Sequence, residues 1–156
     1  MPTLCYRSHM SLLDNKKVYF NYEITEKIEA GLDLLGAEVK SLRAGHGSLD
    51  GSYVSIKHGE AFLVGANIPN YQPNNPSSQF DSKRDRRLLL TQTELGHLIG
   101  IQKEKGLTIV PLSVYNKKRY IKLGIGVARG KKKYDKREVI KKRDTGREIM
   151  RSLKIN

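Results

Sequence analysis

The sequence has a single cysteine, no tryptophan and no long hydrophobic run. One thiol, Cys5, excludes an intrachain disulfide and any metal site built from several thiolates, which suits a reducing compartment. A membrane-spanning helix needs about 20 consecutive apolar residues, and no segment approaches that length or resembles a secretory signal. We therefore expect a cytoplasmic protein that has no contact with a membrane.

Acidic residues are also scarce: the sequence has 16 aspartates and glutamates but 29 lysines and arginines, which gives a net charge of +13. Residues 129–156 hold twelve of the basic residues and four of the acidic ones. This excess indicates a polyanionic partner. The tail has too few apolar residues for a membrane helix, so nucleic acid is the predicted partner. Two further basic clusters lie in the body: Lys83, Arg84, Arg86 and Arg87, then Lys117, Lys118, Arg119 and Lys122.

Alternation of apolar and polar residues predicts β-strands along most of the body. One helix is predicted from the apolar spacing between Leu32 and Leu42, and a second begins at a capping box formed by Thr91 and Glu94. Short turns join neighbouring strands, so the fold class is mainly β with flanking helices: an antiparallel six-stranded barrel of the oligonucleotide-binding (OB) type. The predicted strands cover residues 18–30, 53–57, 61–66, 87–90, 107–115 and 121–127.

The chain divides into three expected parts. Residues 1–14 lack periodicity and are predicted to form a flexible amino-terminal arm, with residues 1–9 dispensable and Met10 as a candidate start. Residues 15–130 form the OB-like RNA-binding barrel, and residues 131–156 form a basic carboxyl-terminal tail. Like charges and Gly146 oppose a helix in the tail, so we expect it to be disordered in the free protein and helical when bound to a polyanion. A disordered, solubilising tail is the alternative.

Side chains that would carry catalysis are scattered along the chain. The four histidines lack His or Cys partners at ligand spacing. His46 and Asp50 flank a glycine-rich turn and are candidates for a nuclease site, but no second acidic cluster is evident to hold its metal ion. Gly124-Ile125-Gly126 does not continue into a phosphate-binding loop. We therefore predict no catalytic residue, no metal site and no cofactor, and a protein that binds instead of catalysing.

Several short sequence segments, taken together and in their order along the chain, form a pattern that is specific for one protein family. Their sequences are Asn15-Lys16-Lys17, Ile28-Glu29-Ala30-Gly31, Glu38-Val39-Lys40-Ser41-Leu42-Arg43, Asp50-Gly51-Ser52-Tyr53, Arg87-Leu88-Leu89-Leu90, Glu104-Lys105-Gly106, and Gly130-Lys131-Lys132-Lys133-Tyr134-Asp135-Lys136-Arg137. Together they resemble the small protein B family over about residues 15–153. The resemblance implies a cytoplasmic protein that binds transfer-messenger RNA and delivers it to stalled ribosomes for trans-translation. In that family the barrel holds the transfer-like domain of the RNA, and the tail enters the decoding centre and the empty message channel.

The charge pattern and the resemblance nominate site residues. Lys16, Lys17, Lys40 and Arg43 would contact phosphates, and Tyr19 would stack on a base. Glu29 would accept hydrogen bonds from a base amine or a 2′-hydroxyl, or would orient a neighbouring lysine. The nominated RNA-binding residues are Asn15, Lys16, Lys17, Tyr19, Glu29, Lys40, Arg43, Leu89, Thr91, Gly130, Lys131, Lys132 and Lys133. The nominated ribosome-engaging residues are Tyr134, Asp135, Lys136, Arg137, Lys141, Arg143, Ile149 and Met150.

Three positions depart from the family pattern. Thr91 replaces an expected Asn or His, and its capping role competes with RNA contact. His46 replaces a basic residue, and Gly146 interrupts the expected tail helix. The alternative function is that of a structural ribosomal protein or a general RNA-binding OB-fold protein, and a nuclease is third. In each case a monomer is expected.

Overall fold

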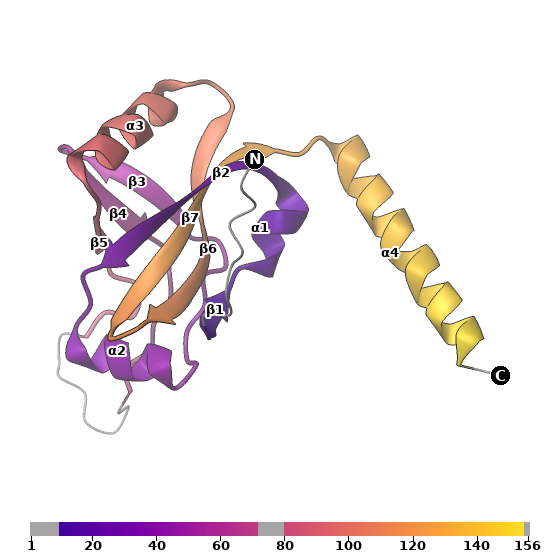
Figure 1. Ribbon diagram of the computed structural model, residues 1–156, viewed down its shortest axis with the longest axis horizontal. Coiled ribbons are helices and arrows are strands. Elements are labelled where there is room, and N and C mark those ends of the chain that lie inside the picture. Colours follow the sequence, from indigo (N-terminus) through magenta and orange to yellow (C-terminus); the bar gives the residue numbers. More distant parts are fainter. Residues whose placement is uncertain (1–9, 72–79, 155–156) are drawn as a thin grey trace.

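The computed structural model describes residues 10–71 and 80–154, so the prediction that residues 1–9 are dispensable lies outside the described residues. Its body is a seven-stranded sheet with the strand order β1-β6-β7-β2-β5-β4-β3, and neighbouring strands are antiparallel (Figure 1). β3 also contacts β6, so the sheet curls until its ends approach each other. The strands are β1 (Ser11–Asp14), β2 (Tyr22–Leu32), β3 (Tyr53–Lys57), β4 (Glu60–Val64), β5 (Arg86–Leu89), β6 (Leu107–Lys117) and β7 (Tyr120–Gly130).

Helices flank this sheet and connect its strands. The described residues contain α1 (Lys16–Asn21), α2 (Gly36–Arg43), α3 (Gln92–Lys103) and α4 (Lys133–Leu153). The predicted class, a mainly antiparallel β protein with flanking helices, is confirmed. None of the helices in the described ranges is long and apolar enough to cross a membrane.

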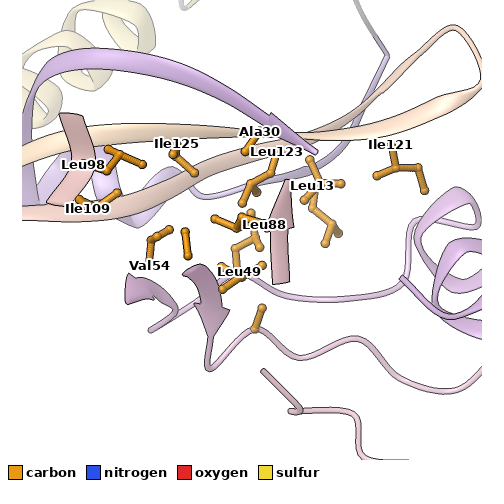
Figure 2. Close-up of a cluster of buried hydrophobic side chains, with 14 of the residues drawn as sticks. Leu13, Ala30, Leu49, Val54, Leu88, Leu98, Ile109, Ile121, Leu123 and Ile125 are labelled. Atoms are coloured by element: carbon orange, nitrogen blue, oxygen red, sulfur yellow. The ribbon is translucent and has the colours of Figure 1, made fainter. Parts of the chain in front are cut away.

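The core lies inside the curled sheet. Ala30 of β2 and Ile125 of β7 lie across from Val54 of β3 and Leu88 of β5 (Figure 2). Along β7 the residues that alternate in the sequence, from Ile121 to Val127, are all buried on this inner side. The inner face therefore holds the fold together by apolar burial. A smaller apolar cluster, formed by Val18, Val110, Leu112 and Ala128, covers part of the opposite face beneath α1.

Two expectations for the amino-terminal part are wrong. Ser11–Asp14 were expected in the flexible arm, but they form β1, which pairs with β6 and makes the sheet seven-stranded instead of six-stranded. The strand expected from Val18 begins at Tyr22, because the preceding six residues form α1. Val18 packs with Val110 of β6. Both β1 and α1 depend on contacts with β6, which lies far along the chain. Such long-range contacts produce no local periodicity in the sequence.

Two local signals in the rest of the body are confirmed, a hairpin turn and a helix cap. The β3–β4 hairpin turns at His58 and Gly59, which both have positive φ, 51° and 75°, as a two-residue turn requires. Thr91 caps α3: its Oγ accepts from the Glu94 backbone N–H at 3.3 Å, and the Glu94 carboxylate accepts from the Thr91 N–H at 2.9 Å. These turns and caps need only a few neighbouring residues, so the sequence predicts them well.

The carboxyl-terminal helix α4 extends away from the sheet (Figure 1). It runs through Gly146, so the expected interruption of the helix at this residue is wrong. A glycine costs about 1 kcal/mol relative to alanine in a helix but does not forbid one. Apolar side chains of α4 remain exposed, namely Ile140, Ile149, Met150 and Leu153.

Candidate RNA-binding surface

The outer face of the sheet brings together residues from three strands. Gly31 of β2 pairs with Leu89 of β5, and Glu29 pairs with Gly124 of β7. Because side chains alternate along a strand and directly paired residues share a face, Glu29 and Leu89 lie on the same side of the sheet. Leu89 is 54% exposed there, whereas the preceding residue, Leu88, is buried on the inner face.

A hollow of about 580 Å³ opens between this face and the start of α3. Three predicted site residues, Glu29, Leu89 and Thr91, line it together. Arg87 and Lys122 add positive charge to the same hollow. Glu60 and Glu94 line the hollow as well, and Arg87 Nη2 forms an ion pair with Glu60 at 2.7 Å. The structure thus places charged side chains of both signs around an exposed apolar side chain, which suits contact with the polar groups of RNA and with a base or sugar.

Glu29 is held by two donors from β6. The Tyr115 hydroxyl donates to its Oε2 at 2.6 Å, and Lys117 Nζ donates to Oε1 at 2.8 Å and to Oε2 at 3.1 Å. Partial burial would raise the pKa of Glu29, but the hydrogen bonds from Lys117 and Tyr115 and the charge of Lys122 outweigh it and lower the pKa. Glu29 is therefore ionised at neutral pH.

Tyr115, Lys117 and Lys122 are site residues that were not nominated from the sequence. Lys117 and Lys122 were noticed only as members of a charged cluster. The available signal was the strand alternation: Tyr115 and Lys122 pair directly across the β6–β7 hairpin, as Lys117 and Tyr120 do. That register brings both lysines to the outer face that carries Glu29.

Helix α2 presents Lys40 and Arg43 to solvent, as predicted. Arg43 also donates from Nη2 to the backbone carbonyl of Arg119 at 3.2 Å. Arg119 belongs to the β6–β7 turn, whose other residue, Lys118, has a positive φ of 56°. Arg43 therefore joins two basic segments that are distant in sequence.

Helix α1 carries a further group of predicted residues. Lys16 and Lys17 are exposed, and Lys17 Nζ forms an ion pair with Asp50 at 2.6 Å. Tyr19 is half-exposed, with Lys27 Nζ 5.7 Å from its ring centroid. Partial burial and the nearby Asp14 carboxylate raise the pKa of Tyr19, so it stays a neutral aromatic surface.

The base of the tail is attached to α1. The Lys131 backbone N–H donates to the Asn21 carbonyl at 2.9 Å, and Lys131 Nζ donates to the Tyr19 carbonyl at 3.0 Å. Gly130 ends β7 opposite Tyr22, and Lys132 is the N-cap residue of α4. The predicted contact residues Gly130, Lys131 and Lys132 thus form the junction between body and tail.

The nominated tail residues all lie on α4. Lys133 and Tyr134 are in its first turn, where the Lys132 N–H also donates to Asp135 Oδ2 at 3.3 Å. The body does not bring these residues into the hollow beside Glu29, since α4 points away from the sheet (Figure 1). The others follow along the helix: Asp135, Lys136, Arg137, Lys141, Arg143, Ile149 and Met150.

Asn15 does not belong to the exposed surface that was expected to contact RNA. Its side chain is 2% exposed, and Nδ2 donates to the carbonyls of Leu49 at 3.3 Å and Pro111 at 3.1 Å. Buried amides need such partners. Asn15 therefore anchors the start of α1 to the body and places Lys16 and Lys17.

The basic cluster of Lys83, Arg84, Arg86 and Arg87, which runs into β5, is only partly exposed. Arg86 and Glu38 are both 0% exposed and form an ion pair at 2.9 Å, and Arg84 Nη2 binds the same carboxylate at 2.7 Å. These two arginines stabilise α2 against the body. Two of the four basic residues of this cluster, Arg84 and Arg86, are therefore engaged by Glu38, while Lys83 and Arg87 are exposed.

His46 and Asp50 were the candidate nuclease residues. Asp50 pairs with Lys17. In the ranges that the structure describes, no group of three or more His, Cys, Asp or Glu side chains is placed to hold a metal ion.

Comparison with known proteins gives consistent matches along the chain. The family model for SmpB protein matches residues 12–155. An SsrA-binding protein of Acetivibrio thermocellus is 50% identical over 142 residues, which cover 91% of this chain and 92% of that protein. An SsrA-binding protein of Thermosipho africanus is 50% identical over 143 residues, covering 91% and 95%. A chain of the solved structure "tmRNA-SmpB: a journey to the center of the bacterial ribosome" is 41% identical, with a TM-score of 0.67, and the match covers 82% of this chain and 93% of that one.

Proposed function

This chain belongs to the SmpB protein family, and from that premise we propose that it binds transfer-messenger RNA and delivers it to stalled ribosomes for trans-translation. The observation that carries the proposal is the outer face of the sheet, where three residues nominated from the family resemblance, Glu29, Leu89 and Thr91, line one hollow together with Arg87 and Lys122. RNA-binding barrels of this architecture bind nucleic acid on an exposed sheet face. The protein then acts in the cytoplasm as a monomeric RNA carrier and not as an enzyme.

The body and the tail have separate tasks in this proposal. The OB-like body, residues 15–130, holds the transfer-like domain of the RNA. The tail, residues 131–156, enters the decoding centre of the small subunit and the empty message channel. At about 1.5 Å per residue, α4 is about 30 Å long, which suits a narrow channel walled by RNA phosphates.

The order of the tail depends on its partner. Many like charges lie along α4, and its apolar side chains are exposed. Helices of marginal sequence need tertiary contacts for stability. The tail is therefore largely disordered in the free protein and helical when ribosomal RNA neutralises its charge.

Truncation after Lys133 tests the division of labour. The shortened protein keeps its affinity for transfer-messenger RNA within a few-fold, because the outer face is intact, and loses tagging of chains on stalled ribosomes. Replacing Asp135, Lys136 and Arg137 together by alanine reproduces most of this loss at full length. The matched control replaces Lys142, Asp144 and Arg147 by alanine. It removes the same charges from the same helix, and we expect it to keep tagging.

Two results would contradict the proposal. Normal tagging by the truncated protein would make the tail a solubilising appendage. Equal affinity for transfer-messenger RNA and for an unstructured RNA of the same length would favour a general RNA-binding protein. Both measurements use purified full-length protein as the reference.

A further inference from the structure

Glu29 is one of three carboxylates, with Glu60 and Glu94, that line the hollow on the outer face of the sheet. Glu29 faces outward from β2 beside Lys122 and Arg87. An unpaired carboxylate would repel an RNA backbone there. Its two oxygens, however, already accept hydrogen bonds within the protein, Oε1 from Lys117 and Oε2 from Tyr115 and Lys117. The carboxylate is thus engaged by its donors on β6, while the Glu29 side chain keeps 35% of its exposure.

The absence of a side chain at residue 124 makes this contact possible. In the sheet order β6-β7-β2, Glu29 pairs with Gly124, and Gly124 pairs with Ser113. Glu29 therefore reaches across β7 to a strand about 10 Å away, at about 4.8 Å per strand. A Cβ at residue 124 would lie 3.4 Å from Ser113 Oγ and 3.7 Å from Tyr115 Cε1. A larger side chain would stand between the carboxylate and its donors.

The three residues form a chain from the interior to the surface. Tyr115 is 4% exposed, so its ring is fixed by the body, and its hydroxyl holds Glu29 from the buried side. Glu29 in turn holds Lys117, the last residue of β6, at the edge of the basic hairpin turn. The Lys117 ammonium has three N–H donors. Because the Glu29 carboxylate has only two oxygens, at least one of these donors points away from it.

We infer that Glu29 is a positioning residue for RNA binding: it fixes the Lys117 ammonium across Gly124, so that this lysine meets a phosphate of the RNA in a preset geometry. The inference rests on the proposed function and assigns Glu29 no direct contact with RNA. A lysine has a long flexible side chain, and holding it in one rotamer before binding removes part of the entropic cost of the contact.

A double-mutant cycle with Lys117→Ala tests the inference. The probe is the transfer-like domain of transfer-messenger RNA, titrated at one fixed salt concentration. Glu29→Ala and Lys117→Ala each weaken binding about tenfold, and the double variant also loses about tenfold, since residues that act through one contact are not additive. A loss of about a hundredfold in the double variant would mean that Glu29 contacts RNA by itself. Tighter binding by Glu29→Ala would mean that it only masks Lys117. Either result overturns the inference.

Tyr115→Phe supplies a second, independent measurement. Tyr115 is 4% exposed and its hydroxyl is engaged by Glu29, so a merely structural role of Tyr115 would leave RNA affinity unchanged once the fold is intact. We expect a loss of a few-fold that disappears in the Glu29→Ala background, with the thermal unfolding midpoint of each variant as the check on folding. Unchanged affinity of a folded Tyr115→Phe protein would also overturn the inference.

The matched control is Glu26→Ala. It removes a carboxylate from the same strand and makes the same change in net charge, but Glu26 pairs with His97 at 2.8 Å. The RNA affinity of Glu26→Ala should stay within about twofold of the wild-type value, because an exposed ion pair contributes little energy. Failure of the wild-type protein to prefer transfer-messenger RNA over unstructured RNA would defeat the proposed function, whereas an additive cycle defeats this inference alone.

Discussion

At the scale of single residues, one charged motif serves two purposes. In the segment Glu38-Val39-Lys40-Ser41-Leu42-Arg43, the helix turns Lys40 and Arg43 to solvent and Glu38 inward. Glu38 accepts from Arg84 and Arg86, and from the Leu35 N–H at 2.9 Å. A buried charge pair is tolerated only when hydrogen bonds offset its desolvation. The buried carboxylate therefore fixes the helix that presents two of the predicted RNA contacts.

Replacing Glu38 by glutamine should lower the free energy of unfolding by about 3–5 kcal/mol at neutral pH, because it leaves the buried Arg86 without its counter-charge. Burial would raise the pKa of Glu38, but hydrogen bonds from Arg84 and Leu35 and the charge of Arg86 lower it below the ordinary value of 4.5. A lowered pKa stabilises the fold above that ordinary value, and the stabilisation is lost as the pH falls through the folded-state value. The gap between wild type and Glu38→Gln should therefore close in acid.

Urea unfolding of both proteins between neutral and acidic pH measures this gap. The exposed Glu23 of β2 provides the control, since Glu23→Gln should change the free energy of unfolding by no more than about 0.5 kcal/mol. A difference below about 1 kcal/mol between wild type and Glu38→Gln at pH 7 would contradict a stabilising role for the buried pair.

At the scale of elements, α4 differs from the helices of the body. Leu98 and Ile101 of α3 are buried, whereas every apolar side chain of α4 whose exposure the structure describes is at least partly exposed. Helical structure in α4 therefore depends on local propensity and on a partner. Gly146 lies in the middle of the helix, and a Cβ there would meet no atom within 4 Å.

Gly146→Ala should increase the helix content of the free protein, because alanine favours a helix by about 1 kcal/mol over glycine. Far-ultraviolet circular dichroism measures the change. Gly100→Ala is the control: Gly100 lies in α3, also with open space around it, and a helix already held by the body should gain little signal. An unchanged spectrum for Gly146→Ala would mean that the free tail is already fully helical.

At the scale of the whole molecule, the tertiary structure brings together basic residues that lie far apart in the sequence. The outer sheet face, the α2–hairpin contact made by Arg43, and the α1–tail junction made by Lys131 come from segments spread along the whole chain. Large folded RNAs are bound mainly through phosphates and 2′-hydroxyls. The affinity of the body should accordingly depend strongly on salt.

If the body neutralises about four phosphates, the slope of log affinity against log salt should be near −3, at about 0.7 per contact. Lys40→Ala and Arg43→Ala should each weaken binding and make the slope shallower without lowering the thermal midpoint, because both side chains are exposed. Lys105→Ala, in the exposed turn before β6, serves as the control and should leave the slope unchanged. A slope near zero would exclude binding dominated by phosphates.

Local sequence patterns predicted much of the fold and part of the site. The β6–β7 hairpin and the Thr91 cap follow from alternation and from a four-residue motif, which act over short distances. The positions Glu29, Leu89 and Thr91 came from the family resemblance, and the structure places them around one hollow. Strand β1 and the partners of Glu29 were not predicted, because β1 depends on its pairing with the distant strand β6, and the partners of Glu29 depend on the long-range pairing of β2 with the β6–β7 hairpin.

The sequence alone determined the charge of the protein, its mainly β class and the basic tail, since these properties follow from composition and from periodicities of two and 3.6 residues. Only the tertiary structure decided which charges face outward. It buried Arg86 with Glu38 and left Lys117 exposed, although both belong to basic clusters that look alike in sequence. The physical reason is that the cost of burying a charge depends on the partners that other strands and helices bring to it, and those partners are set by the packing of the whole chain.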